Sequence, residues 1–262
     1  MQKFNSAGVD IAFIDSHPAH GSGEPVLLIH GFASNHQVNW VATGWSRTLH
    51  EAGYRVIMLD NRGHGHSQKL YAQSDYSSPI MADDAKRLLD HLKIEKAAVM
   101  GYSMGARISA FLTLHHPARV SRVVFAGLAE GMVTGVPGAE AIAEGLEAPS
   151  RADVTDPGAL TFRIFAENTK SDLRALAACI RSTRVKIKPE ALGQIRVPVL
   201  VVAGDADEVA GPIAPLVALM PTARGVALPG RNHMNAVGDK GYKQAVLAFL
   251  AESQIPARAS AP

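Results

Sequence analysis

A serine flanked by small residues is the part of the sequence best suited to chemistry. The run from Gly101 to Gly105 reads Gly-Tyr-Ser-Met-Gly, between a strand-like stretch at 96–101 and a helix-like stretch at 104–114. A serine on a sharp turn between a strand and a helix is held out of the sheet, with its hydroxyl free to attack. The flanking glycines allow this turn without steric clash. The pattern therefore predicts a nucleophile at Ser103.

The base and the acid that such a serine needs are found after the last two predicted strands. A serine hydroxyl is a weak nucleophile at neutral pH, so it needs a base that a carboxylate orients. With a serine on such a turn, the acid and then the histidine follow along the chain. His233 comes shortly after the last predicted strand. Two carboxylates, Asp205 and Asp207, follow the preceding strand, and the residues by themselves leave either one as the acid.

Acyl transfer also needs hydrogen-bond donors for the oxyanion, and two backbone amides are in suitable places. One is the N–H of Met104, directly after the nucleophile. The other is expected in the loop after the strand at 26–30, where Gly31 lets the chain bend so that the amide of Phe32 points into the site. We therefore predict an oxyanion hole made by the backbone N–H groups of Phe32 and Met104.

Composition excludes several function classes. The chain has 262 residues, of which 47% are hydrophobic, so a sizeable core is possible. Its 26 basic and 24 acidic residues give a net charge of +2, which indicates neither a nucleic-acid partner nor a membrane surface. The N-terminal residues lack a signal-peptide pattern, and the single Cys179 cannot form an intrachain disulfide. We expect a soluble cytoplasmic protein, either a monomer or a homodimer.

Strand-like runs alternate with helix-like stretches, which predicts an α/β fold with a mostly parallel sheet of eight strands and helices on its faces. The first two strands are expected to pair antiparallel. The expected strands are 2–6, 11–16, 26–30, 55–60, 96–101, 120–128, 197–203 and 225–228. The expected helices of the sheet domain are about 38–52, 80–92, 104–114, a short one ending near 220, and 241–251.

The alternation stops between residues 129 and 193, where glycines and prolines punctuate short helical pieces. This predicts a small helical cap at 129–193, inserted into one core domain made of 1–128 and 194–262. The Ala/Pro/Ser-rich tail at 256–262 is expected to fray.

Taken together, these residues resemble the α/β-hydrolase superfamily, and the chain is similar to small bacterial carboxylesterases and 3-oxoadipate enol-lactonase-like hydrolases. The resemblance covers nearly the whole chain except the cap. In the family's Gly-x-x-Asp motif the fourth residue is catalytic, which implies that Asp207 is the acid. The family's Asp-x-Arg-Gly-x-Gly-x-Ser motif implies loop-supporting roles for Arg62, His64 and Ser67. The segments that carry the resemblance are 30–32, 60–67, 101–105, 204–207 and His233.

The resemblance also narrows the chemistry. Ala106 stands where the family often has a second glycine, a departure that affects no catalytic residue. A serine at position 103 excludes the branches that use another nucleophile, because epoxide hydrolases and haloalkane dehalogenases would have aspartate there and dienelactone hydrolases cysteine.

Other signals are less specific. Asn35, His36 and Trp40 follow the oxyanion loop and Tyr102 precedes the nucleophile, so these four residues are candidates for substrate binding; the first three are equally well explained as loop packing. Seven basic residues between 161 and 188, against two acidic ones, favour a carboxylate-bearing substrate if they face the cleft, or else form a solvated helix face. No cluster has zinc-ligand spacing, so we predict no metal and no cofactor.

The sequence therefore predicts a cofactor-independent serine hydrolase that cleaves a small carboxylic ester or lactone through an acyl-enzyme. A second hypothesis keeps the triad but changes the reaction to carbon–carbon bond hydrolysis or cofactor-free perhydrolysis. A third is a receptor-like protein of this fold with little turnover.

Overall fold

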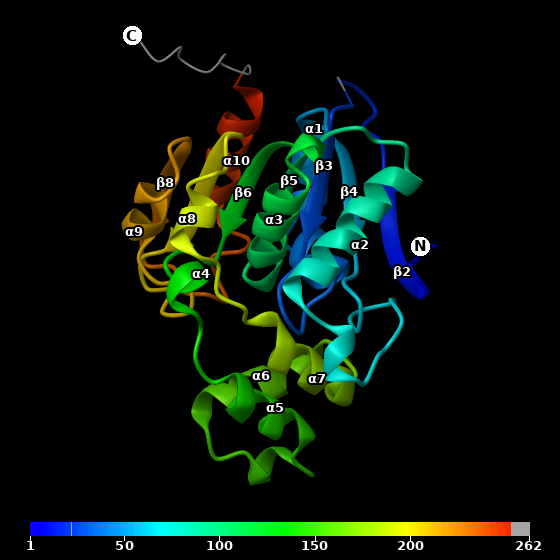
Figure 1. The fold of residues 1–262 in the computed structure, drawn as a ribbon, viewed down its shortest axis with the longest axis vertical. Coiled ribbons are helices and arrows are strands. Elements are labelled where there is room, and N and C mark those ends of the chain that lie inside the picture. The colour runs from blue at the N-terminus through cyan, green and yellow to red at the C-terminus, as the bar shows by residue number, and fades with distance from the viewer. Residues whose placement is uncertain (22, 253–262) are drawn as a thin grey trace.

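A central sheet of eight strands organises the fold (Figure 1). The structure is a computed structural model that describes residues 1–21 and 23–252, so the tail at 256–262 lies outside the described residues. The strands are β1 (Gln2–Ser6), β2 (Val9–Ser16), β3 (Pro25–Ile29), β4 (Arg55–Leu59), β5 (Ala97–Tyr102), β6 (Val120–Ala126), β7 (Val199–Gly204) and β8 (Ala223–Leu228).

The strand order across the sheet is β1-β2-β4-β3-β5-β6-β7-β8. β2 pairs antiparallel with both β1 and β4, and every other neighbouring pair is parallel. The predicted mostly parallel eight-stranded sheet with helices on its faces is confirmed. Every predicted strand is present, with ends that differ from the prediction by at most two residues.

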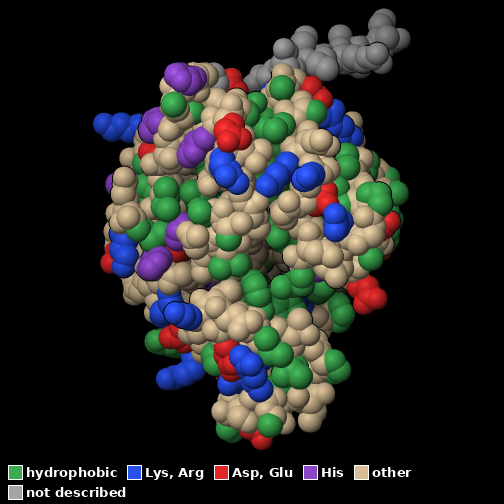
Figure 2. Space-filling view, turned by 180° about the vertical axis from the view of Figure 1, so that it is seen from behind, with side chains coloured by type: hydrophobic (Ala, Val, Ile, Leu, Met, Phe, Trp, Pro, Cys, Tyr) green, Lys and Arg blue, Asp and Glu red, His purple; other side chains and the backbone are tan. Residues whose placement is uncertain are grey.

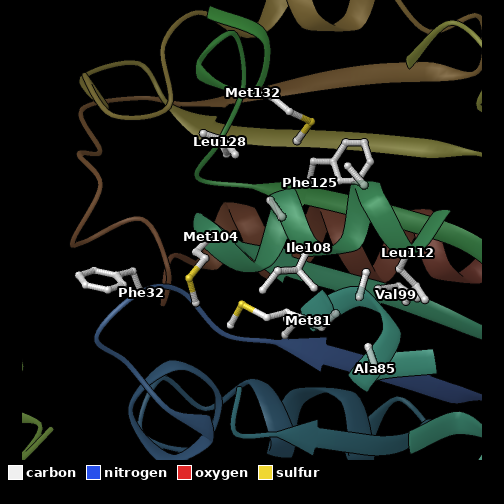
Figure 3. Packing of buried hydrophobic residues seen from close by; sticks show 14 of the residues in the cluster. Phe32, Met81, Ala85, Val99, Met104, Ile108, Leu112, Phe125, Leu128 and Met132 are labelled. Carbon is white, nitrogen blue, oxygen red and sulfur yellow. The ribbon is translucent and has the colours of Figure 1, made fainter. Parts of the chain in front are cut away.

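Helices cover both faces of the sheet because the central strands are apolar on both sides. Leu27 and Ile29 of β3 belong to the core under α2 and α3, whereas Val26 and Leu28 belong to the core under α1 and α10. Figure 3 shows the first of these cores, with Ile108 of α3 beside Met81 of α2. The helices are α1 (Trp45–Glu51), α2 (Ser78–His91), α3 (Met104–His115), α9 (Ile213–Ala218) and α10 (Lys240–Ala251).

The predicted helix at 38–52 is wrong in one respect, because it is two helical pieces. A short π-helix at Gln37–Val41 ends before Gly44, which takes a left-handed φ of 79°, and α1 begins at Trp45. In one continuous helix, residues five positions apart point about 140° away from each other. The break at Gly44 lets the side chains of Trp40 and Trp45 both enter the same core, where each is fully buried.

The segment between β6 and β7, all of which the structure describes, consists of short helices joined by loops and holds no strand. Asp156 and Asp172 accept hydrogen bonds from the third amides of α6 and α7, at 2.7 and 3.0 Å, which explains where these helices begin. The middle three helices, α5 to α7, pack on one another and form a lobe beyond one end of the sheet (Figure 1). The helices are α4 (Gly131–Thr134), α5 (Ala139–Glu147), α6 (Pro157–Asn168), α7 (Leu173–Thr183) and α8 (Pro189–Leu192).

The same segment meets the rest of the chain at a hollow. In Figure 2 hydrophobic side chains gather where the helical lobe of α5 to α7 joins the main body of the molecule. Among the described residues, no helix combines the length and the apolar character that a membrane crossing requires.

The turn from β5 into α3 is the tightest part of the backbone. Ser103 stands alone between the strand and the helix, with φ 56° and ψ −114°. A methyl group on Gly105 would lie 1.9 Å from the carbonyl oxygen of Ile29 in β3, and one on Gly101 would lie 2.1 Å from the carbonyl oxygen of Gly105. Only glycine at these two positions lets α3 approach the sheet closely enough to make the turn.

We predict that Gly105→Ala lowers the free energy of unfolding by about 3 kcal/mol or more, because the new methyl group meets backbone that cannot move independently. Urea unfolding of the variant and of wild type measures the effect. Gly238→Ala is the matched control, since its methyl group would meet its nearest neighbour, the side chain of Thr43, at an ordinary 3.7 Å. Equal stability of the two variants would contradict the prediction.

Candidate active site

Three side chains from distant parts of the chain form one hydrogen-bonded series. The Nε2 atom of His233 lies 3.0 Å from the hydroxyl oxygen of Ser103. Its other ring nitrogen, Nδ1, lies 2.9 and 3.0 Å from the two carboxylate oxygens of Asp207. Ser103 follows β5, Asp207 follows β7 and His233 follows β8, so all three are at the carboxyl ends of parallel strands, where sheets of this kind bind their ligands.

The structure distinguishes the two candidate acids by their partners. Asp207 is 4% exposed, and besides His233 its Oδ1 atom accepts hydrogen bonds from the amides of Val209 and Ala210 at 3.1 and 2.9 Å. The exposed Asp205 accepts a hydrogen bond from the amide of Gly230 at 2.7 Å and does not contact His233. The geometry thus gives His233 the carboxylate of Asp207, while Asp205 holds the turn that leads to the histidine.

Tyr102 holds the histidine loop from the side of the nucleophile. Its hydroxyl donates a 2.6 Å hydrogen bond to the carbonyl oxygen of His233, and its ring lies 5.5 Å from the imidazole. Burial, and to a smaller extent the charge of Asp207, raises the pKa of Tyr102, so the phenol keeps its proton and remains a donor. Tyr102 also lines the pocket above Ser103.

The two predicted oxyanion donors lie beside the nucleophile. Phe32 and Met104 both line the space next to Ser103, and within the described part of the chain nothing accepts a hydrogen bond from either backbone amide. The loop is held open by Asn39, whose Oδ1 atom accepts a 3.1 Å hydrogen bond from the amide of Gly31. Two backbone donors without acceptors, next to a serine hydroxyl, can bind an oxygen that gains negative charge.

Buried histidines support the oxyanion loop from below. His30 accepts a 2.9 Å hydrogen bond from the amide of Asn61 through Nε2, so its Nδ1 carries the proton and donates to the carbonyl oxygen of Gly31 at 2.8 Å. The ring of His64 lies 5.3 Å from that of His30 and 5.9 Å from that of Phe32. Burial, with a smaller effect of His30, lowers the pKa of His64 to about 3, so this ring is neutral at pH 7.

The contacts of the other two motif residues fit a loop-supporting role as well. Arg62 makes a bidentate ion pair with the buried Asp84, at 2.7 and 2.8 Å. Ser67 donates a 2.6 Å hydrogen bond to the carbonyl oxygen of Asp60 and accepts one from the amide of Ala12 at 2.9 Å.

Two cavities meet at Ser103. The larger has a volume of about 460 Å³ and lies beside His233; the smaller has about 40 Å³ and extends beyond the nucleophile toward α3 and α7. Phe162 of α6 borders both. The larger cavity is lined by Gly31, Phe32, Ser34, Val38, Asn39, Tyr102, Ser103, Gly158, Thr161, Phe162, Phe165, Val209, His233, Met234 and Val237.

The structure does not bring the other three candidates for substrate binding into either cavity. Asn35 uses its side chain to accept a hydrogen bond from the amide of Val38 at 2.9 Å. His36 is buried and contacts the carboxylate of Asp60 at 2.8 Å, and Trp40 is fully enclosed in the core. Their polar groups face the protein interior, so loop packing explains all three residues.

Sequence reasoning missed several residues that do line the cavities. Phe162 and Phe165 are three apart on α6, a spacing that places both on one side of a helix. Arg107 lies four residues after Ser103 on α3 and borders the smaller cavity, so the same periodicity could have found it. Asn39 gave no signal, because only the fold brings its side chain to Gly31.

Two arginines of the helical segment make their contacts away from the cavities. Arg163 is buried and donates to the carbonyl oxygens of Gly145 and Ala148, while Arg181 pairs with Glu140 and Glu147 on the surface. Of the seven basic residues between 161 and 188, Arg184 borders the smaller cavity. In the described ranges, 1–21 and 23–252, no group of three or more histidine, cysteine or acidic side chains could hold a metal ion.

Comparisons with known proteins agree with this architecture. A family model described as the alpha/beta hydrolase fold matches residues 24–144. An enol-lactonase from Burkholderia xenovorans superposes with a TM-score of 0.78 at 22% identity, over 96% of this chain and all of that one. An esterase from Exiguobacterium antarcticum gives a TM-score of 0.78 at 21% identity, over 95% of this chain and 99% of that one. The chain is therefore a protein of the α/β-hydrolase fold.

Sequence similarity to curated proteins is confined to part of the chain. A 2-hydroxy-6-oxononadienedioate/2-hydroxy-6-oxononatrienedioate hydrolase of Escherichia coli is 38% identical over 110 residues, which are 40% of this chain and 36% of that protein. The chain spans less than half the length of the first curated relatives that it matches. The likeness to solved structures, at 22% and 21% identity, extends over almost the whole chain and shows the fold.

The buried His64 predicts a pH dependence of stability. Its pKa of about 3 in the folded protein lies below the ordinary 6.5, so the unfolded chain takes up a proton first as the pH falls. The free energy of unfolding is therefore highest above pH 6.5 and decreases progressively as the pH falls toward 3. Between pH 7 and pH 5 the free energy of unfolding of wild type should fall by about 2 kcal/mol more than that of His64→Gln, as urea unfolding at the two pH values can measure. The control is His17→Gln, which changes an exposed histidine and should follow the pH profile of wild type. Identical pH profiles for wild type and His64→Gln would refute the prediction.

The two aspartates provide a matched pair of variants. We predict that Asp207→Asn lowers kcat for a small ester by about 10,000-fold, because the amide cannot hold His233 in the required tautomer or stabilise its positive charge. Asp205→Asn should stay within about threefold of wild type, since an amide oxygen can still accept the bond from Gly230. Steady-state hydrolysis of p-nitrophenyl acetate measures both. A larger loss in Asp205→Asn than in Asp207→Asn would reverse the assignment.

Proposed function

We propose that the chain is a serine hydrolase that cleaves a small carboxylic ester or lactone through an acyl-enzyme. The observation that carries the proposal is the hydrogen-bonded series from Asp207 through His233 to Ser103, which opens onto a cavity of about 460 Å³. A cavity of this size, with mostly apolar walls, suits a small organic substrate.

In the first half-reaction the oxygen of Ser103 attacks the substrate carbonyl while Nε2 of His233 takes the hydroxyl proton. The new oxyanion lies against the amides of Phe32 and Met104, and Asp207 stabilises the imidazolium. The tetrahedral intermediate then collapses. The bond to the leaving oxygen breaks and His233 gives its proton to that oxygen, so that a free alcohol departs and the acyl group remains as an ester of Ser103.

In the second half-reaction water takes the place of the alcohol. His233 removes a proton from the water, the hydroxide attacks the acyl carbon, and Ser103 leaves with the proton that His233 gives back. The products are a carboxylic acid and the free enzyme. A lactone follows the same course, except that the alcohol stays attached to the acid.

The segment at 129–193 serves in this proposal as a cap on the sheet domain formed by 1–128 and 194–262. Support comes from Phe162 and Phe165 of α6, which border the same cavity as Ser103. Closing one side of the cavity with apolar side chains limits water around the reacting groups and strengthens their electrostatic interactions. The apolar side chains that the cap places in the cavity wall therefore influence which substrates bind.

Carbon–carbon bond hydrolysis is a second candidate, favoured by the 38% identity to the Escherichia coli hydrolase named above. The same three side chains can serve it, and the substrate is then a ketone whose leaving group departs as a carbanion that must be protonated. Perhydrolysis, and a binding role with little turnover, require no different residues. Activity toward a panel of esters, lactones and vinylogous diketones separates these possibilities.

We predict that Ser103→Ala lowers the hydrolysis rate of p-nitrophenyl acetate by about 10,000-fold or more, because among the described residues the hydroxyl of Ser103 is the only one that hydrogen-bonds to the imidazole of His233. A fluorophosphonate probe should label wild type and leave this variant unlabelled, as intact-mass spectrometry can show.

Ser121→Ala is the matched control, since this serine lies at the opposite end of the sheet, at the start of β6. It should retain wild-type rates and labelling. Wild-type turnover by Ser103→Ala would refute the mechanism, and failure of the probe to label folded wild-type protein would favour a binding role.

A further inference from the structure

Two arginines from different parts of the chain lie at the smaller cavity. Arg107 stands one turn after Ser103 on α3, and Arg184 follows the last residue of α7. Both border the cavity of about 40 Å³, together with Ser103 and Met104. Residues four apart on a helix lie on the same face, so Arg107 is directed to the same side of α3 as the nucleophile.

Neither guanidinium is neutralised within the described part of the chain, where no carboxylate lies within ion-pair distance of either. Arg107 donates instead to backbone carbonyl oxygens, those of Gly131, Met132 and Val185, at 2.6 to 2.9 Å. Arg184 donates to the carbonyl oxygens of Val136 and Pro137.

Two other arginines of the helical segment do have acidic partners. Arg163 pairs with Glu167 at 2.6 Å, and Arg181 pairs with Glu140 and Glu147 at 2.8 Å. Arg107 is only 2% exposed. Burial, followed by the charge of Arg184, lowers the pKa of Arg107 to about 10, and burial lowers that of Arg184 to about 10, so both remain protonated at pH 7. A buried and a half-buried positive charge without an acid are costly unless a ligand supplies the negative charge.

The position of His233 shows which part of a substrate reaches these arginines. His233 must lie beside the leaving oxygen in order to protonate it. It borders the larger cavity and not the smaller one, so the leaving group belongs in the larger cavity. The acyl part, on the other side of the carbonyl carbon, is then directed into the smaller cavity.

The size of the smaller cavity limits what can enter it. A water molecule needs roughly 10–15 Å³ of such volume, so about 40 Å³ accommodates a group of about three heavy atoms, which is the size of a carboxylate. The carboxylate alone fills this volume, so the short hydrocarbon link between the two carbonyl carbons lies where the two cavities meet at Ser103, beside the apolar side chains of Phe32 and Phe162. The remaining lining residues are Phe32, Leu128, Val136, Phe162, Ile180, Thr183 and Val209.

We propose that the acyl part of the substrate carries a carboxylate, which the guanidinium groups of Arg107 and Arg184 bind in the smaller cavity while Ser103 attacks the carbonyl at the other end. The substrate class is a half-ester of a short dicarboxylic acid, or a lactone with a carboxylate side chain. This inference rests on the serine-hydrolase function proposed above. Arg107 and Arg184 are the residues that determine specificity.

The test compares two ethyl esters that differ only in charge. Ethyl hydrogen succinate has a carboxylate where ethyl succinamate has a neutral amide of nearly the same shape. We expect kcat/KM to be at least tenfold higher for the anionic ester, because paired charges in a partly buried site outweigh a neutral hydrogen bond. Ethanol release measures the rate for both, with Ser103→Ala as the blank.

Arg184→Gln should reduce this preference to less than threefold, and Arg184→Lys should restore part of it. The control is Arg174→Gln, which removes an exposed arginine of α7 whose guanidinium lies 5.1 Å from the ring of Tyr71. It should keep the full preference. Because the preference is a ratio measured on one protein sample, partial misfolding of a variant does not change it.

A wild-type enzyme that shows no preference, or a preference that survives in Arg184→Gln, would overturn the proposal. Either result would leave the hydrolase function standing, provided that Ser103→Ala is inactive. Ester hydrolysis by Ser103→Ala at the wild-type rate would instead remove the function on which the proposal rests.

Discussion

The close approach of α3 to the sheet is the constraint on which the site depends. Gly105 lies so near the carbonyl oxygen of Ile29 that no side chain fits between them, and this contact fixes the start of α3 beside the end of β3. Ser103 is thereby held at φ 56°, above the strand ends, with its hydroxyl toward His233. The same contact brings the amides of Met104 and Phe32 together, because one begins α3 and the other follows β3. A single steric condition therefore places both the nucleophile and the two backbone donors.

The rest of the sheet supplies the remaining groups through its order of strands. β6, β7 and β8 follow one another on one side of β5, so the loops that carry Asp207 and His233 approach Ser103 from that side. β3 and β4 lie on the other side and carry the oxyanion loop with its support of buried, uncharged histidines. The helical segment after β6 contributes the aromatic side chains of α6 to the wall of the larger cavity. Each part of the site comes from a different strand end, and none can shift far without moving a strand.

Charge is distributed unevenly around the nucleophile. On the His233 side, Asp207 is buried but is satisfied by the imidazole and two amides. On the opposite side, Arg107 and Arg184 are held only by carbonyl oxygens, which orient a guanidinium but do not neutralise it. In the proposed reaction, the neutralised acid lies near the leaving group and the positive charge lies near the acyl group. This asymmetry underlies the proposed choice of an anionic acyl chain.

Local motifs were enough to predict the strand pattern and to select Ser103, His233 and the glycines around the serine as candidates, since these features depend on residues that are neighbours in the chain. Local patterns could not separate Asp205 from Asp207, find Asn39 and Arg107, or remove His36 and Trp40 from the site. They also did not reveal the break at Gly44, which allows the side chains of Trp40 and Trp45 to enter the same core. These points were decided by tertiary structure, because burial, hydrogen-bond partners and missing counter-charges arise only when segments far apart in sequence are packed together.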